Sequence, residues 1–387
     1  CDIDLAAAKA SNVETLGHNF RNNYEVAVDS FGTMWQSDND DDGNRGVRIN
    51  YVMDYGNFGY KDEMTGAGWR TKRVNMETDV PQLHWYQNDP GVVPNLLLTG
   101  AGSPTGILVN EGTALGAAFT NQIIHCDAGP RTVRAYPVTP DGAGYKAEMV
   151  DILTSSDSWY RPADVAIAPD GSLFVADWYD AGVGGHHMVD HNKGNIMGRI
   201  YRVAASGAAA TTPKVDLASP DGCVAALQSP NRATVYMAWR KLQALGTQAE
   251  PALQKLYKSE NPRMRPPALH LLARIPGRAE NYLRGLFDEP DRDLRVTGVR
   301  IARVMHLSGQ LDLGDFIDHA GKTRILAEKD PAVCREILLT LPLAADNAEA
   351  ALMWSTLAMK YQGGDRWYLE ALGIGARGKE DRCFETW

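Results

Sequence analysis

Residues 38–44 follow an apolar run that predicts a β-strand, and they combine several side chains that could bind a metal ion. Neighbouring carboxylates repel one another unless a cation neutralises them, and hard cations such as calcium prefer oxygen ligands. The D-x-D-x-D-G spacing matches the start of an EF-hand loop, but Ile49 stands where the closing glutamate belongs. We therefore predict a calcium site outside the EF-hand class, with a solvated polar turn as the alternative. Its candidate ligands are Asp38, Asp40, Asp42 and Asn44.

The step from an apolar strand to an aspartate recurs at Asp127 and Asp177, and an outgoing strand follows each time. These repeated units predict the blades of a β-propeller, in which loops collect at the two faces. The commoner role of an aspartate at a strand end is to cap backbone N–H groups, and this alternative stays open for both residues. The units cover roughly residues 16–60, 103–153 and 161–204.

The loop of residues 178–197 is unusually long for a compact repeat, and such loops are often functional. Its histidines could act as general acids or bases, or as metal ligands. An ordered polar lid without chemistry is the alternative. The weak catalytic candidates are His186, His187 and His191.

Composition excludes several classes of protein. The 387 residues are 44% hydrophobic and 22% charged, as in folded proteins, and the formal net charge of -9 argues against a nucleic-acid partner. We found no transmembrane run and no CxxCH haem attachment motif. The five cysteines are scattered, which predicts buried thiols. A start at Cys1 rather than Met predicts that the chain is part of a longer protein.

The chain divides into a strand-rich part and a helical part. Short β-rich runs broken by Gly, Pro, Asn and Asp fill residues 1–204, which predicts about three blades of a propeller. Residues 205–219 read as a linker, and residues 220–387 show helical periodicity with irregular repeats of a HEAT-like α-solenoid. Proline-containing helix starts are predicted after Ser229, Asn261, Glu289 and Asp330.

Residues 17–60 resemble the soluble PQQ-dependent glucose/sorbosone dehydrogenases, which are six-bladed propellers. The matching positions are Arg21-Asn22, Asp29, Gly32, Trp35, Ile49-Asn50 and Asn57-Phe58-Gly59-Tyr60. The resemblance implies that Arg21 and Asn22 contact the quinone cofactor and that the general-base histidine lies upstream of Cys1. The calcium loop of that family is replaced here by residues 38–44, so the acidic groups have moved.

A second resemblance covers the whole chain. The motifs beginning at His84, Thr99, His125 and Arg161 resemble large dehydrogenases, predicted to be membrane-bound, of planctomycetes and verrucomicrobia. Those proteins join a propeller to HEAT-like repeats and then to a c-type cytochrome. The resemblance implies an exported, periplasmic protein that passes substrate electrons to haem in the same full-length chain. Parts outside this sequence could attach it to a membrane.

Three functions are consistent with these patterns. The first is an extracytoplasmic quinoprotein-like dehydrogenase that oxidises a sugar or polyol. The second is a non-catalytic scaffold whose propeller binds glycan or protein and whose solenoid docks partners. The third is a calcium-dependent propeller hydrolase or lyase that uses the loop of residues 178–197.

Overall fold

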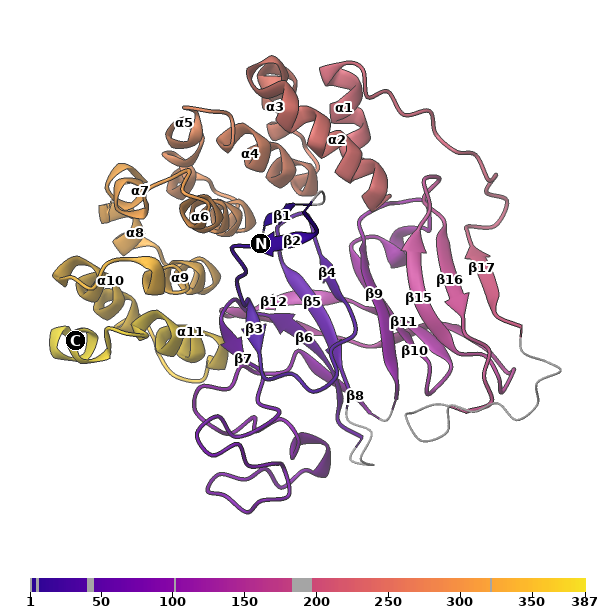
Figure 1. The fold of residues 1–387 in the computed structure, drawn as a ribbon, viewed down its shortest axis with the longest axis horizontal. Helices are drawn as coiled ribbons and strands as arrows, with labels where there is room; N and C mark the ends of the chain where they lie inside the picture. Colours follow the sequence, from indigo (N-terminus) through magenta and orange to yellow (C-terminus); the bar gives the residue numbers. More distant parts are fainter. Residues whose placement is uncertain (1, 5–6, 40–44, 101, 183–196, 321) are drawn as a thin grey trace.

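A computed structural model of the chain describes residues 2–4, 7–39, 45–100, 102–182, 197–320 and 322–387. Within these ranges, antiparallel sheets fill the first half and helices fill the second half (Figure 1). The predicted division into a strand-rich and a helical part is confirmed. No helix of the described ranges is long and apolar enough to span a membrane.

The first sheet joins four strands in the order β4-β5-β6-β8. Their side chains alternate between two faces, as the period of a strand requires. Trp35 and Tyr51 pack into the largest core, whereas Gln36 and Asn50 pair on the opposite face, where Asn50 Nδ2 donates to Gln36 Oε1 (2.8 Å). The strands are β4 (Val26–Val28), β5 (Met34–Asp38), β6 (Val47–Val52) and β8 (Leu97–Gly100).

The second and third sheets follow the same antiparallel plan. The order is β9-β10-β11-β14 in the second sheet and β15-β16-β17 in the third. A hairpin, β12 (Val138–Asp141) with β13 (Gly144–Ala147), is inserted before β14. The sheet strands are β9 (Pro104–Asn110), β10 (Gln122–Asp127), β11 (Thr132–Tyr136), β14 (Val150–Thr154), β15 (Pro162–Ile167), β16 (Leu173–Asp177) and β17 (Arg199–Val203).

The second and third sheets lie within a residue of the predicted units 103–153 and 161–204, whereas the first sheet extends beyond the predicted unit 16–60 because its last strand is β8 (Leu97–Gly100). Two short pairs complete the strands, β1 (Asp2–Asp4) with β2 (Lys9–Ser11), and β3 (Gly17–His18) with β7 (Gly56–Asn57). The number of blades in a closed ring stays a prediction.

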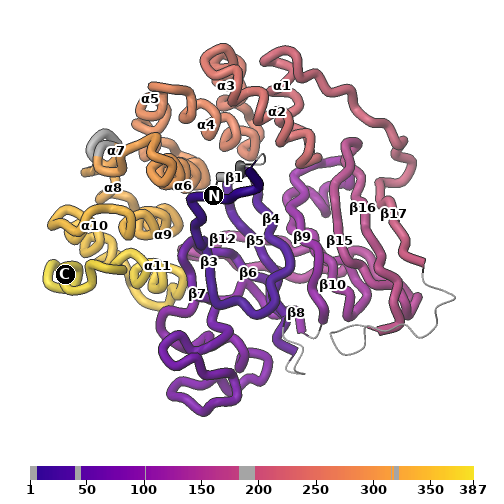
Figure 2. Tube along the Cα trace, in the orientation of Figure 1, coloured from indigo at the N-terminus to yellow at the C-terminus, as the bar shows by residue number. Residues whose placement is uncertain are grey.

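The described helices form one curved row beside the sheets (Figure 1), and successive helices pack on one another. After β17, residues 204–219 form neither helix nor strand, and Figure 2 shows this long connection reaching α1. A regular HEAT repeat stays a prediction. The helices are α1 (Pro220–Leu227), α2 (Arg232–Leu245), α3 (Glu250–Tyr257), α4 (Arg265–Ala273), α5 (Ala279–Leu283), α6 (Arg292–Leu307), α7 (Leu313–Ala320), α8 (Lys322–Ala327), α9 (Pro331–Leu338), α10 (Ala348–Ala358), α11 (Arg366–Ala376) and α12 (Glu380–Thr386).

Side-chain caps fix the starts of several helices, including α2, α6 and α9. Asp330 caps α9 at the predicted position by accepting two backbone N–H groups. The caps of α2 and α6 are Asn231 and Asp291, so the predicted starts after Ser229 and Glu289 are wrong by two residues. In both cases the residue after the proline offers the better-placed side-chain oxygen.

The helical part is joined to the first sheet by a buried ionic cluster. Glu336 of α9 is 1% exposed, and its carboxylate accepts from Arg300 (2.8 Å), Arg335 (2.7 Å) and Arg303 (3.1 Å). Burial alone would raise the pKa of Glu336, but the three guanidinium charges outweigh it and hold this pKa well below its ordinary value. Arg300 also donates to Thr33 Oγ1 of the sheet part (3.0 Å). The cluster therefore joins the two parts.

Aromatic packing reinforces the same contact. Trp367 of α11 lies with its ring centroid 5.4 Å from that of Tyr51. A Cβ atom built on Gly144 would clash with the Trp367 ring, so only glycine fits at this point of the β12–β13 hairpin. One core cluster thus includes residues of both parts.

Candidate functional site

The three strand-end aspartates are buried and make equivalent contacts at one edge of the sheets, here called the aspartate rim. Each carboxylate accepts a backbone N–H from the segment before its sheet and a guanidinium N–H from its outgoing strand. The backbone donors are Arg21 (2.9 Å) and Asn22 (2.6 Å) to Asp38, Ser103 (2.7 Å) to Asp127, and Arg161 (2.8 Å) to Asp177. The guanidinium donors are Arg48 (2.9 Å), Arg134 (2.9 Å) and Arg199 (2.7 Å), in the same order. The capping alternative for Asp127 and Asp177 is confirmed.

Asp38 has the same structural role as the other two aspartates. Its Oδ1 accepts from Asn22 and Asn39, and its Oδ2 accepts from Arg21 and Arg48, so protein donors occupy both oxygens. No group of three or more His, Cys, Asp or Glu in the described ranges is arranged to hold a metal ion. The other predicted ligands, Asp40, Asp42 and Asn44, lie outside the described residues. A calcium site there stays a prediction, and Asp38 could join it only by giving up these bonds.

Asp127 has an altered acidity. Burial raises its pKa to about 6, although the Arg134 charge and the N–H groups of Ser103 and Gly129 oppose the rise. In the unfolded chain this carboxyl titrates near its ordinary pKa of 3.8. Between these two values the folded state binds more protons, so the contribution of Asp127 to stability is present below pH 4 and is lost as the pH rises through 6.

We therefore expect Asp127→Asn to remove the part of the pH dependence of the free energy of unfolding that Asp127 causes. Asparagine keeps an acceptor for Ser103 but does not titrate. The free energy of unfolding of the wild type, minus that of Asp127→Asn, should fall by about 2–3 kcal/mol between pH 4 and pH 7. Urea denaturation at each pH measures this difference. A difference that rises with pH would show that the ion pair with Arg134 outweighs burial.

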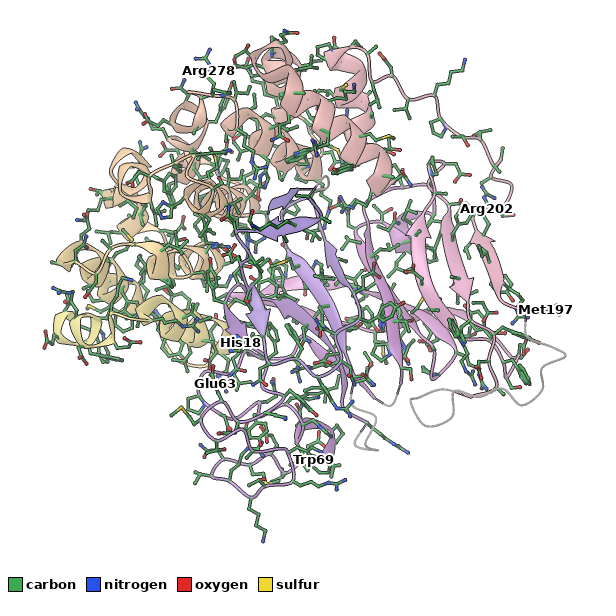
Figure 3. All side chains as sticks on the ribbon, viewed as in Figure 1. His18, Glu63, Trp69, Met197, Arg202 and Arg278 are labelled. Atoms are coloured by element: carbon green, nitrogen blue, oxygen red, sulfur yellow. The ribbon has the colours of Figure 1, made fainter. Side chains whose placement is uncertain are left out.

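The two halves of the quinoprotein-like motif lie side by side. β3 pairs in parallel with β7, and the Phe58 N–H donates to the His18 carbonyl (2.9 Å). Side-chain contacts of His18 and Asn19 also hold the segment before Arg21 in place. Asn19 Nδ2 donates to Asn57 Oδ1 (2.8 Å), and His18 Nε2 lies 3.1 Å from Glu63 Oε1. Figure 3 shows His18 and Glu63 close together beside the first sheet. This network holds the segment that leads to Arg21.

Arg21 and Asn22 are positioned by their backbone bonds to Asp38. The Arg21 guanidinium donates to the Asn39 carbonyl (3.1 Å) and lies 5.8 Å from the ring centroid of Tyr60. The carboxamide of Asn22 lies beside this guanidinium and is exposed. The pair predicted to contact a cofactor therefore stands at the aspartate rim, with Arg21 half-buried and Asn22 exposed.

The segment of residues 61–95 supports the rim from outside the sheet. Trp85 is fully buried, its Nε1 donates to the Gly46 carbonyl (2.6 Å), and its ring lies 3.6 Å from the Arg48 guanidinium carbon. A cation stacked on an aromatic face is favourable when both are shielded from water. Trp85 thus holds Arg48, which in turn holds Asp38.

Two further arginines of the rim were not predicted as site residues. Arg161 is 7% exposed, and among the described residues its guanidinium donates to the carbonyls of Tyr160 (2.9 Å) and Ala181 (3.1 Å), while its Nε has no partner there. Arg131, in the turn after Asp127, also has a buried Nε without a partner there. Within the described ranges neither forms an ion pair with a carboxylate. Burial first, and then the Arg131 charge, lower the pKa of Arg161, whereas the charges of Asp180, Asp177 and Asp157 oppose this fall.

A sequence signal for Arg161 existed in the repeat. Counting back 17 residues from Asp38 reaches Arg21, and counting back 16 residues from Asp177 reaches Arg161. Both residues offer their N–H to the strand-end carboxylate of their own sheet. The two spacings differ by one residue, so superposing the aspartates brings Arg161 to the position of Asn22, next to Arg21, and indicates the region rather than the exact residue.

The long loop of the third sheet contributes little to the described site. His186, His187 and His191 lie outside the described residues, so their roles as acids, bases or ligands stay predictions. At the start of the loop, the Arg199 guanidinium carbon lies 4.0 Å from the ring centroid of Tyr179. Cys1 also lies outside the described ranges, and the other four cysteines are free, buried thiols, as predicted.

The described residues thus form antiparallel sheets with an arginine-rich rim, and a row of helices packs beside the sheets. The chain belongs to the family described as a domain of unknown function, DUF7133, whose model matches residues 2–207. No curated protein matches the chain.

Several solved structures show a weak likeness. A glucose dehydrogenase is 17% identical with a TM-score of 0.35, covering 52% of this chain and 49% of its own. A proposed oxidoreductase (glucose dehydrogenase) from Thermus thermophilus is 16% identical (TM-score 0.34; 49% and 47%). The PQQ-bound aldose sugar dehydrogenase of Streptomyces coelicolor is 15% identical (TM-score 0.31; 49% and 45%). The chain spans about half the length of these proteins, and likenesses of this size establish neither its activity nor its cofactor.

Proposed function

We propose that this chain is part of an extracytoplasmic quinoprotein-like dehydrogenase that oxidises a sugar or polyol, with PQQ held at the aspartate rim. The observation that carries the proposal is the buried guanidinium of Arg161, which forms no direct ion pair with a carboxylate in the described ranges and whose Nε has no hydrogen-bond partner there. A buried guanidinium that is not directly paired is costly, and an unsatisfied buried donor calls for a ligand.

The charges of the rim favour an anion over a cation. The carboxylates of Asp38, Asp127 and Asp177 are each neutralised by an arginine of the same sheet. The guanidinium groups of Arg131 and Arg161 remain available, and planar guanidinium groups match carboxylates in geometry. A flat tricarboxylate is therefore well suited to this rim.

PQQ is such a molecule. When bound, it supplies an ortho-quinone that accepts two electrons from an alcohol. Arg131 and Arg161 would hold its carboxylates, and Arg21 with Asn22 would orient it from the first sheet. The phenol oxygen of Tyr160 is buried and has no hydrogen-bond partner among the described residues, so it adds a polar contact next to Arg161.

The wider architecture is part of the proposal. The outer face of the third sheet exposes Phe174 (39%) and Ile200 (78%), an apolar surface that a further sheet of a propeller would cover. A six-bladed ring, a HEAT-like solenoid, an exported location and a c-type cytochrome in the same full-length chain stay proposals based on the sequence resemblance.

Arginine variants of the full-length protein test the cofactor site. We expect Arg161→Met and Arg131→Met each to weaken PQQ binding by about 10- to 100-fold, because each removes a charge-assisted hydrogen bond. Isothermal titration calorimetry measures the affinity without requiring turnover. The matched control is Arg202→Met, because Arg202 pairs with Asp170 and lies at the opposite end of β17 from Met197 and the rim (Figure 3).

Two results would contradict the proposal. Equal losses of affinity in all three variants would show that arginine removal acts through general destabilisation. Glycan binding without any PQQ binding would instead favour the scaffold hypothesis.

A further inference from the structure

A polar cleft lies between the first sheet and the helices, far along β5 from the aspartate rim. Its volume is about 120 Å³, and it is formed by the β4–β5 turn, the β12–β13 hairpin and the start of α6. A buried water needs at least about 10–15 Å³ of such space, so the cleft has room for on the order of ten heavy atoms. A monosaccharide or a small polyol is of this size.

Several polar groups converge on the cleft with hydrogen-bonding capacity to spare. Asp29 lines it from the β4–β5 turn, where its Oδ1 accepts from the backbone N–H groups of Phe31 and Thr33, so only its Oδ2 can serve a ligand. Asp293 lines the cleft from the first turn of α6. The carboxamide of Asn121 and the hydroxyl of Tyr145 form no hydrogen bond with any described residue. Carboxylates accept, and amide and phenol groups donate, so together they match the mixed donors and acceptors of adjacent hydroxyl groups.

Aromatic rings provide the apolar part of the wall. Trp35 and Tyr145 meet edge to face with ring centroids 5.1 Å apart, and both line the cleft. The C–H faces of a polyol pack well on such rings, while its hydroxyl groups reach the polar groups at the edge. The nearby cation, Arg263, is already engaged by Glu111 (2.6 Å), so it does not demand an anion.

We propose that this cleft is a second binding site, separate from the aspartate rim, for a small polyhydroxylated molecule of monosaccharide size. Because it lies between the sheet part and the helical part, a bound molecule contacts both and holds them together. The site is independent of the cofactor proposal, since Asp29 precedes β5 and Asp38 ends it.

The test is a titration of the full-length protein with D-glucose, D-xylose and sorbitol, followed by saturation-transfer NMR and calorimetry. We expect saturable binding of at least one of them, weakened about 10-fold in Asp293→Asn and in Tyr145→Phe. Asn121→Gly should act in the same direction, because glycine keeps the left-handed backbone (φ 60°) and removes only the carboxamide.

A matched control and a cofactor-site variant separate the outcomes. Asp221→Asn should bind as the wild type does, because Asp221 also stands in the first turn of a helix but is exposed in α1. Arg161→Met should bind the polyol normally. No saturable binding in the wild type, unchanged affinity in both Asp293→Asn and Tyr145→Phe, or loss in Arg161→Met would overturn the proposal.

Discussion

Replacing Glu336 with alanine should lower the free energy of unfolding by about 3–5 kcal/mol, because it leaves the buried guanidinium groups of Arg300 and Arg335 without a carboxylate partner and Arg303 with Asp54 alone. Arg300, Arg303 and Arg335 all bind this carboxylate, and Glu336 itself is 1% exposed. Urea denaturation followed by circular dichroism measures the loss. Since Arg300 also reaches Thr33, the helical part should detach from the sheets before either part unfolds.

The control for this variant is Glu349→Gln. Glu349 pairs with Lys322 on the surface, with side chains 43% and 37% exposed, and such pairs contribute about 0–1 kcal/mol. Comparable losses in the two variants would contradict the assignment of the Glu336 cluster as the main ionic contact between the two parts.

Trp85→Ala should have the second large effect. Trp85 is fully buried, and removing an aromatic side chain from a core costs about 3–5 kcal/mol. The variant also removes the ring on which the Arg48 guanidinium stacks. Asp38 and the backbone of Arg21 then lose their support, so PQQ binding should weaken along with stability. Chemical denaturation and calorimetry at a temperature where the variant is folded measure the two effects.

Trp85→Phe and Trp387→Ala provide the comparisons. Phenylalanine keeps a ring below Arg48 but loses the N–H that donates to Gly46 and part of the indole volume, a change of about 1–3 kcal/mol. Trp387 is 66% exposed, so its removal should change stability little. A Trp85→Ala protein as stable as Trp387→Ala would contradict the proposed support of the rim.

Local rules explain why much of the fold could be predicted. The strand-to-aspartate pattern repeats at Asp38, Asp127 and Asp177, and each of these aspartates ends a strand of a separate sheet, although the last strand of the first sheet, β8, lies outside its predicted unit. The change to helical periodicity after residue 219 can be recognised in the sequence without knowledge of any tertiary contact. Asp330 caps its helix as expected, because a cap and its N–H partners are neighbours in the chain. The inserted β12–β13 hairpin was missed because its alternation is short and exposed.

The site was harder to predict because burial and pairing depend on contacts between distant segments. In sequence, Asp38 resembles a metal ligand, and only the fold shows that Arg48 and three backbone N–H groups already donate to its carboxylate. Arg161 looks like an ordinary basic residue before a proline. Its importance lies in having no carboxylate partner within the described ranges while being 7% exposed, which no local pattern reveals. In the sequence, the carboxylates of the rim suggested a bound cation. In the structure each of them is paired with an arginine, and the guanidinium groups of Arg131 and Arg161, which form no ion pair within the described ranges, favour an anion.

The most direct test compares PQQ with its uncharged trimethyl ester. Both have the same ring system, but only PQQ offers carboxylates to Arg131 and Arg161. Calorimetric titration of the full-length protein should show PQQ binding at least about 100-fold more tightly than the ester, and Arg161→Met should reduce this preference. Equal affinity for the two compounds, or no binding of PQQ, would contradict the proposal that the aspartate rim binds an anionic quinone.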